Sequence, residues 1–258
     1  ILQITPWNAP LNTCGWQIAP AVCMGNAVVL KPDPRTPITG GHVIARVFEE
    51  AGLPKGLLQV IPGAADVGVA VVEAPDVRVV SFTGSTAAGR KVGELASANL
   101  KRVHLELGGK NSIIVLPGAD VAKAASAAAF GSFLHQGQIC MSTGRIVVHE
   151  SLYDEFVEIL AGKAQHLPVG NPHTEQVALG PVIDHKQLER MDSLVKATVS
   201  AGATLVAGGT HQDLFYKPTV LTGVTKDMPA YSEEIFGPVA SVFKYSTTKE
   251  AIDLVSDT

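Results

Sequence analysis

The sequence predicts an α/β protein, with a doubly wound parallel sheet in a first domain and a second α/β domain after it. Short apolar runs rich in Val and Ile, bounded by Pro, Gly or Asn, alternate with stretches of helical composition. Such runs are typical of buried parallel strands, and their alternation with helices predicts βαβ units. This rhythm changes after the pair Gly108-Gly109, so we place the domain boundary there, giving domains of residues 1–108 and 109–258.

The first domain is expected to contain strands at residues 1–4, 27–30, 57–61, 77–82 and 102–107. Helices are expected between them, at residues 37–51, 65–73 and 86–98. The first of these helices ends at Gly52 and is followed by Pro54, two common helix stop signals. The second domain is expected to contain strands at residues 112–116, 145–149 and 204–206, and helices at residues 120–134, 153–164 and 184–201.

Both ends of the chain lie inside predicted elements. The chain begins without Met in the apparent strand Ile1-Leu2-Gln3-Ile4 and closes on residues 251–255, which read as an uncapped helix. We therefore expect an internal piece of a longer protein, with both domains truncated. Such a piece should be poorly stable alone, because missing elements would leave sheet edges and apolar surface uncovered.

The composition excludes several classes of function. The 258 residues are 46% hydrophobic and carry a net charge of −4 with both signs interspersed, which argues against nucleic acid as a partner. No apolar run approaches the roughly 20 residues of a membrane span, and no signal peptide opens the chain. Three cysteines give no even disulfide framework, so a reducing, cytoplasmic setting is expected. No metal site is expected.

Cys140 is the candidate nucleophile. It lies between small and polar residues just after the predicted helix 120–134, where backbone N–H groups can stabilise a thiolate. The alternative is that Cys140 is a small buried hydrophobic residue, as most free cysteines are.

Two polar residues follow predicted strands at the edge where open α/β sheets bind ligands. The amide of Asn8 can donate to a developing oxyanion, or Asn8 can simply form a turn before Pro10. Lys31 can meet a ribose hydroxyl or a phosphate, or it can be a solvated strand end.

Two further motifs follow. Gly84 and Ser85 lie between a strand and a helix, where N–H groups and the helix dipole favour a phosphate; a plain strand-to-helix turn is the alternative. Glu106 lies on an otherwise apolar strand, so desolvation is expected to raise its pKa towards that of a general base. Gly108, just after that strand, allows a ligand or another backbone to approach closely.

Taken in order, these motifs resemble the NAD(P)-dependent aldehyde dehydrogenases, and most closely the bacterial benzaldehyde and vanillin type. The matching pieces span nearly the whole chain: Pro6-Trp7-Asn8, Lys31-Pro32, Phe82-Thr83-Gly84-Ser85, Leu105-Glu106-Leu107-Gly108-Gly109-Lys110, Gly137-Gln138-Ile139-Cys140, Gly180-Pro181-Val182-Ile183 and Glu233-Glu234-Ile235-Phe236-Gly237-Pro238. The narrower likeness rests on residues 31–36 and 135–141.

The resemblance implies a role for each candidate. Cys140 attacks the aldehyde, the Asn8 amide holds the oxyanion, and Glu106 activates the water that releases the acid. NAD or NADP would be bound by residues that include Trp7, Lys31, Arg35, Gly84, Ser85, Gly108, Glu234 and Phe236. The aldehyde would contact Asn12, Thr13, Trp16, Ile139 and Met141, and a dimer or tetramer is expected.

Five residues of the chain carry less direct expectations. Many NAD-specific members have a Glu where this chain has Pro34, so NADP should be accepted as well, with Arg35 available to its 2′-phosphate. Cys14 and Cys23 are interpreted as packing residues, and His135 as structural.

An aromatic aldehyde is the expected substrate. The resemblance implies a helix after the loop of Pro6-Trp7-Asn8, with Asn12, Thr13 and Trp16 facing the aldehyde. Trp16 offers a face for stacking, while Asn12 and Thr13 either bond ring substituents or cap this helix. Two other functions remain open. A CoA-acylating dehydrogenase would not need Glu106, and a non-catalytic structural relative would not need Cys140.

Overall fold

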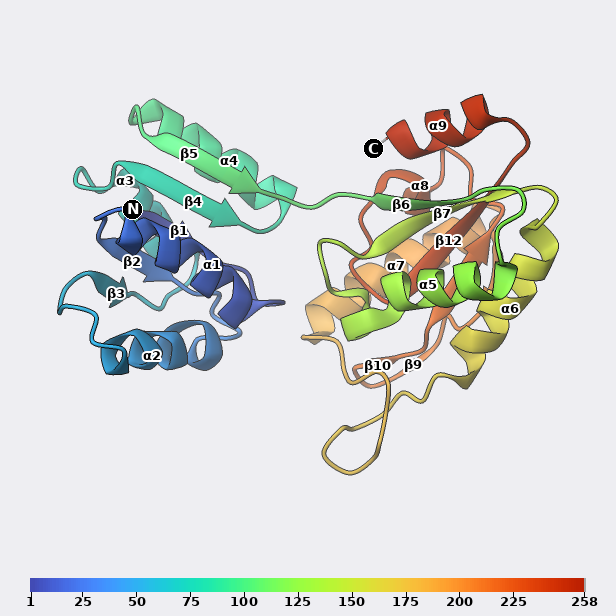
Figure 1. Cartoon of the computed structure of the whole chain (residues 1–258), viewed down its shortest axis with the longest axis horizontal. Coiled ribbons are helices and arrows are strands. Elements are labelled where there is room, and N and C mark those ends of the chain that lie inside the picture. The colour runs from blue at the N-terminus through green and yellow to red at the C-terminus, as the bar shows by residue number, and fades with distance from the viewer. Residues whose placement is uncertain (258) are drawn as a thin grey trace. The chain divides into compact units, whose positions relative to one another are not determined.

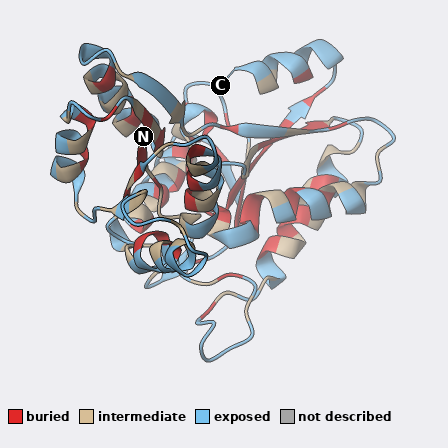
Figure 2. Ribbon diagram, turned by 60° about the vertical axis from the view of Figure 1, so that its left-hand side comes forward, coloured by how far each residue is buried: buried red, intermediate tan, exposed pale blue. Residues whose placement is uncertain are grey.

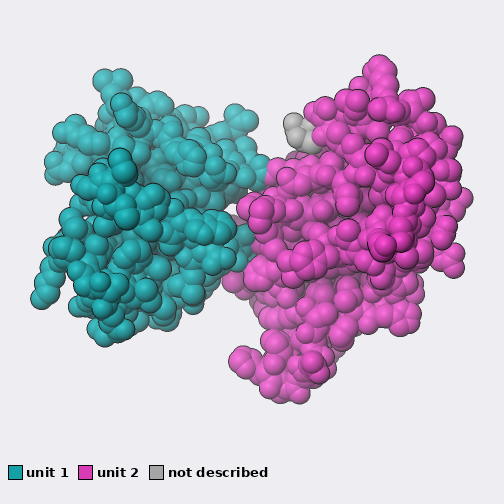
Figure 3. Space-filling view, in the orientation of Figure 1, with its two compact units in different colours: residues 1–108 teal, residues 109–258 magenta. Residues whose placement is uncertain are grey.

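The structure is a computed structural model that describes residues 1–257. The chain divides into two compact units, residues 1–108 (unit 1) and 109–258 (unit 2) (Figure 3). The division falls at the glycine pair Gly108-Gly109. Each unit has its own sheet and its own apolar core, so each is described by itself.

Unit 1 is built on a five-stranded parallel sheet with the strand order β3-β2-β1-β4-β5 (Figure 1). Its strands are β1 (Leu2–Ile4), β2 (Val28–Lys31), β3 (Leu58–Val60), β4 (Val79–Thr83) and β5 (Arg102–Glu106). From β1 the chain moves outward to β3 and then crosses to the other side of β1 for β4 and β5. The predicted doubly wound sheet is confirmed.

The helices of unit 1 cover both faces of this sheet. They are α1 (Pro10–Cys23), the π-type turn η1 (Ile38–Val43), α2 (Ile44–Glu50), α3 (Ala65–Glu73) and α4 (Thr86–Ala98). Alternation along the strands divides the core: Val28 and Leu30 pack with α1 and α2, whereas Val29 faces the cluster of α3 and α4. The predicted helix 37–51 is therefore present, but its first turns are η1 rather than regular α-helix.

Unit 2 contains a five-stranded sheet with the order β6-β7-β12-β11-β8, in which only β8 runs antiparallel to its neighbour. The strands are β6 (Asn111–Val115), β7 (Thr143–His149), β8 (Thr204–Ala207), β11 (Thr219–Thr222) and β12 (Val239–Tyr245). A separate hairpin joins β9 (His211–Gln212) and β10 (Phe215–Tyr216).

The central strands of this sheet are buried between two layers of helices (Figure 2). Ile146 and Val148 of β7 pack with α5 (Val121–Phe133) and α6 (Tyr153–His166), while Val147 packs with α7 (His185–Ser200) and α8 (Pro229–Ser232). The short 3₁₀ segment η2 (Leu134–Gly137) follows α5. Within residues 1–257, no helix has the length and apolar composition that crossing a membrane requires.

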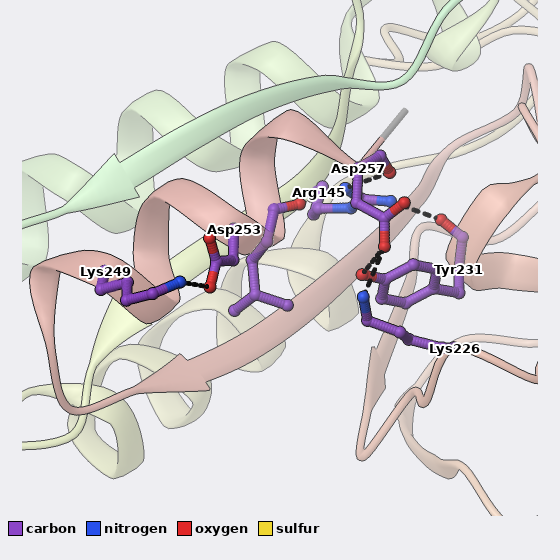
Figure 4. Close-up of polar contacts among 7 residues, drawn as sticks. Arg145, Lys226, Tyr231, Lys249, Asp253 and Asp257 are labelled. Atoms are coloured by element: carbon purple, nitrogen blue, oxygen red, sulfur yellow. Dashed lines mark hydrogen bonds and ion pairs between the residues drawn. The ribbon is translucent and has the colours of Figure 1, made fainter.

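The last helix of unit 2, α9 (Thr248–Ser256), is fastened to the sheet by the fully buried Arg145 of β7 (Figure 4). The guanidinium donates to the carbonyls of Leu254, Asp257 (3.0 Å) and Tyr231 (2.7 Å), and lies 4.5 Å from the centre of the Tyr231 ring. The helix begins with a capping box formed by Thr247 and Glu250. The prediction of an uncapped helix is therefore wrong at its N-terminus.

Candidate active site

The sheet of unit 1 brings four of the predicted motifs to one edge. The parallel register pairs Ile4 with Lys31 and with Phe82, and pairs Thr83 with Glu106. The segments that follow these strands, including Asn8, therefore leave the sheet at its carboxyl edge. That is where open α/β sheets bind ligands.

Lys31 ends β2 with its side chain buried. Its Nζ donates to the carbonyl of Pro32 at 3.2 Å, and its aliphatic stem lies against Gly68 of α3. Burial lowers the pKa of Lys31, while the charges of Asp33 and Asp66 act in the opposite direction. The alternative of a solvated strand end is wrong, and a buried ammonium at this edge is suited to a ligand hydroxyl or anion.

Arg35 is held in place by its neighbours. Its Nε and Nη2 contact the two carboxylate oxygens of Asp33 at 2.8 and 2.9 Å, and its guanidinium lies 4.9 Å from the centre of the Trp7 ring. Burial by itself raises the pKa of Asp33, but the hydrogen bonds and the charge of Arg35 hold that pKa below its ordinary value. Arg35 is thus paired with a carboxylate.

The turn between β4 and α4 requires a small residue. A Cβ added at Gly84 would lie 2.7 Å from the ring of Phe82. The hydroxyl of Ser85 caps α4 by accepting from the N–H of Ala88 at 3.4 Å. The turn therefore brings the N-terminal end of a 13-residue helix to the carboxyl edge of the sheet.

Glu106 is exposed, with 63% of its side chain accessible, so the expected desolvation is not present. The reason is that β5 is an edge strand of unit 1, and even Val103 on its other face is exposed. The Oε1 atom of Glu106 lies 3.3 Å from Nε2 of His104. The carboxylate is therefore accessible to water and lies beside the His104 ring.

In unit 2, Cys140 lies on a sharply turned loop. His135, Gln136 and Gly137 have positive φ values of 53°, 56° and 64°, which reverse the chain after α5. Asn111 of β6 donates to the carbonyls of Cys140 at 2.6 Å and Ser142 at 3.2 Å. The thiol is free and exposed, so the alternative of a buried packing residue is wrong for Cys140.

The cysteine loop packs directly against the segment 234–238. A Cβ added at Gly137 would lie only 2.1 Å from the carbonyl oxygen of Gly237. Buried Gln138 accepts from the N–H of Ile183 at 2.9 Å. A pocket of unit 2 is lined by Gly137, Ile139 and Ser142 of this loop, by Glu234 and Phe236, and by Lys110.

The segment 234–238 is fixed by α7. Gln187 donates to the carbonyl of Phe236 at 2.8 Å, and Arg190 donates to the carbonyls of Ile235 and Glu234 at 3.0 and 2.7 Å. Burial raises the pKa of Glu234, opposed by a backbone hydrogen bond from Gly109 and by the charges of Arg190 and Lys110. The backbone around Glu234 is therefore held by contacts that do not use its carboxylate.

Lys110 was given no role by the sequence motifs, yet it is buried in this pocket. Its Nζ donates to the carbonyl of Glu233 at 2.9 Å. Burial lowers the pKa of Lys110 to about 8, and the charge of Arg145 acts in the same direction. Because the residue follows a glycine pair at the start of a strand, its pattern resembles an exposed lysine and gives no sign of this burial.

Helix α1 places the predicted substrate residues on its exposed side. Trp16 is 72% exposed and Asn12 is exposed, while Cys14 and Ile18 face the core. The helix begins at Pro10 after Ala9, so the alternative that Asn12 and Thr13 cap it is wrong. In unit 2, Met141 is likewise 74% exposed beside Cys140.

The remaining two cysteines differ. Cys14 is fully buried and its Sγ donates to the carbonyl of Gly40 at 3.2 Å, as expected of a packing residue. Cys23 is exposed at the end of α1, so the prediction that it packs in the core is wrong. The pattern fails there because Cys23 is the last residue of the helix.

The residues at the carboxyl edge of unit 1 fit groups of a dinucleotide. Unit 1 offers a buried ammonium at Lys31, a helix N-terminus after Gly84 and an indole at Trp7, which suit hydroxyl, phosphate and aromatic groups. Within unit 2, the carboxylate of Glu234 accepts a backbone hydrogen bond from Gly109 and keeps further acceptor positions for a hydroxyl group.

The chain belongs to the aldehyde dehydrogenase family, whose model matches residues 1–258. A vanillin dehydrogenase from Amycolatopsis is 61% identical over 98% of this chain, and a benzaldehyde dehydrogenase [NAD(+)] from Pseudomonas putida is 49% identical over 98%. The crystal structure of an NAD-dependent benzaldehyde dehydrogenase from Corynebacterium glutamicum superposes with a TM-score of 0.94 at 43% identity, over 100% of this chain and 56% of that one. The chain spans about half the length of the curated relatives it matches, 52% for each of the first two.

Proposed function

We propose that the protein carrying this chain oxidises an aldehyde, and preferentially an aromatic one, to the carboxylic acid with NAD or NADP. The observation that carries the proposal is the exposed thiol of Cys140 on a strained loop, in a chain of the aldehyde dehydrogenase family. Unit 1 is proposed to bind the cofactor and unit 2 to supply the nucleophile.

The first step is addition of the Cys140 thiolate to the aldehyde carbon, which forms a C–S bond and moves the carbonyl electron pair onto oxygen. The Asn8 amide and the Cys140 backbone N–H are proposed to donate to this oxyanion, because fixed donors stabilise developing charge strongly. The loop geometry supports the role of Cys140 as nucleophile, since Asn111 holds the carbonyl of Cys140 and the thiol is exposed.

The dinucleotide is proposed to be held by Trp7, Lys31, Ser85 and Glu234, together with the glycines Gly84 and Gly108 and with Phe236. When bound, the dinucleotide would act as the oxidant, taking a hydride (a hydrogen with two electrons) from the former aldehyde carbon. The product that remains on Cys140 is a thioester. Buried Lys31 and the fixed backbone around Glu234 support this assignment.

Release of the acid is proposed to depend on Glu106. Its carboxylate removes a proton from water as the water oxygen forms a bond to the thioester carbon. The C–S bond then breaks, which restores the Cys140 thiolate and gives the carboxylic acid. The exposure of the Glu106 side chain supports access of water to its carboxylate.

The preference for an aromatic aldehyde rests on the names of the relatives and on the exposed face of α1. Trp16 and Asn12 are one helical turn apart, so a ring and an amide are presented together. A planar substrate stacked on Trp16 would gain about 0.5–1.5 kcal/mol of binding free energy beyond that of its buried area.

The compartment and the oligomeric state are also part of the proposal. Three free cysteines support a reducing compartment, the cytoplasm. A homo-oligomer is proposed from family membership alone.

The test is aldehyde-dependent formation of reduced nicotinamide by the complete protein, measured with and without CoA. Benzaldehyde should be oxidised to benzoate without CoA, and Cys140→Ala should abolish turnover while the dinucleotide still binds. A strict requirement for CoA would replace hydrolysis by acyl transfer. Absence of turnover with every aldehyde in a panel of aromatic and aliphatic substrates would refute the proposal.

A further inference from the structure

Asp33 and Arg35 form a rigid clasp at the carboxyl edge of unit 1. Two hydrogen bonds of 2.8 and 2.9 Å join the guanidinium to both carboxylate oxygens, and the backbone N–H of Arg35 donates to Asp33 Oδ1 at 2.9 Å. Pro32 and Pro34 flank Asp33, so the backbone has little freedom to open. The pair is preorganised rather than a chance surface contact.

The clasp lies where a dinucleotide-binding sheet reads the ribose. Asp33 is two residues beyond the end of β2, next to β1 in the order β3-β2-β1-β4-β5. In doubly wound sheets an acidic residue in this region bonds the 2′-hydroxyl of NAD, or an Arg accommodates the 2′-phosphate of NADP. This chain carries both residues, with the Arg bound to the acid.

We propose that Asp33 is a specificity-determining residue, which disfavours NADP by holding Arg35 in an ion pair against Trp7. The inference rests on the proposed function and names which dinucleotide that site prefers. Asp33 already occupies Nε and Nη2 of Arg35, a pair of donors that a phosphate would otherwise bind bidentately.

A 2′-phosphate has to displace the Asp33 carboxylate or lie beside it, whereas the 2′-hydroxyl of NAD carries no charge. The side chain of Asp33 is only 17% exposed, so solvent screens its charge little. The Arg35 guanidinium is also 4.9 Å from the centre of the Trp7 ring, and leaving the clasp loses that contact. NADP is therefore accepted less readily than NAD.

The test measures dissociation constants of NAD and NADP by calorimetry, in the complete protein and in four variants. Asp33→Asn frees Arg35 and should shift the NADP-to-NAD affinity ratio about tenfold towards NADP, equivalent to about 1.4 kcal/mol. Asp33→Asn combined with Arg35→Gln should lose that gain. Asp76→Asn is the matched control, since it removes the same charge just before β4, at the amino end of that strand, and should leave the ratio unchanged.

A ratio that stays within about twofold of the wild type in Asp33→Asn overturns the inference, because a freed guanidinium should gain a phosphate partner. A gain that persists in the double variant overturns the role of Arg35. If Asp33→Asn does not fold, Arg35→Gln alone decides: it should weaken NADP relative to NAD, and a relative gain for NADP refutes the inference. If the wild type oxidises aldehydes with NAD, any of these failures leaves the proposed function intact; binding of neither dinucleotide overturns both.

Discussion

Gly137 is a position at which the loop that carries Cys140 has no room for a side chain. Its φ is +64°, and an added Cβ would lie 2.1 Å from the Gly237 oxygen and 2.4 Å from the Gly237 carbonyl carbon. Both contacts are with backbone, which cannot rotate away. Gly137→Ala therefore has to move the loop that carries Cys140 away from the segment 234–238.

Two costs add up in this variant. A left-handed backbone costs an L residue about 1–2 kcal/mol. Overpacking adds about 1–3 kcal/mol, because the Cβ has to retreat by about 1 Å from the Gly237 oxygen. Gly118→Ala is the matched control, since its φ is +83° but nothing lies within 4 Å of the added Cβ.

The assay is the free energy of unfolding in urea, together with the rate at which iodoacetamide alkylates Cys140, followed by peptide mass spectrometry. Gly137→Ala should lower the free energy of unfolding by about 3 kcal/mol. Gly118→Ala should show only the part of this loss that comes from the left-handed backbone. The alkylation rate of Cys140 should change in Gly137→Ala alone. Equal stabilities and equal alkylation rates for the two variants would refute the packing of the loop described above.

Three further outcomes are expected. Arg145→Met should lower the free energy of unfolding by about 3 kcal/mol, because the carbonyls of Tyr231 and Leu254 lose a buried donor; the exposed Lys226→Met should have a much smaller effect, and equal losses would contradict the role of Arg145. Lys110 has a folded pKa of about 8 against an ordinary 10.5, so the unfolded state holds a proton that the folded state has lost between these values. Stability should therefore rise with pH over that window by up to about 3 kcal/mol relative to Lys110→Met, and parallel pH profiles would refute this. Trp16→Ala should narrow the kcat/KM preference for benzaldehyde over hexanal by about tenfold, and a wild-type preference for hexanal would remove the aromatic assignment.

Local patterns predict the frame of this fold well. The apolar runs that became β2, β4 and β7 are short and bounded by turn residues, and their burial follows from their composition. Helix α1 was expected only through the family resemblance, because Pro10, Gly15 and Pro20 give it a poor helical signal. Its formation depends on the packing of Cys14 and Ile18, which is tertiary information.

The environment of the site residues is harder to read from the sequence. Glu106 lies in an apolar strand, but a sequence does not reveal that β5 is an edge strand whose side chains are exposed. The spacing of Asp33 and Arg35 permits an ion pair, yet only the structure shows the bidentate geometry. Lys110 illustrates the same limit, since its buried ammonium donates to the carbonyl of Glu233, a residue more than a hundred positions away in the sequence.

In the proposed mechanism, Cys140 carries an acyl group that Glu106 helps to hydrolyse. The most direct measurement is rapid-quench mass spectrometry of the Glu106→Gln variant of the complete protein, mixed with benzaldehyde and NAD. We expect one benzoyl group on the peptide that contains Cys140, together with a burst of reduced nicotinamide and a slow steady state. Steady turnover without any adduct on Cys140, or an adduct on another residue, would contradict the proposed mechanism.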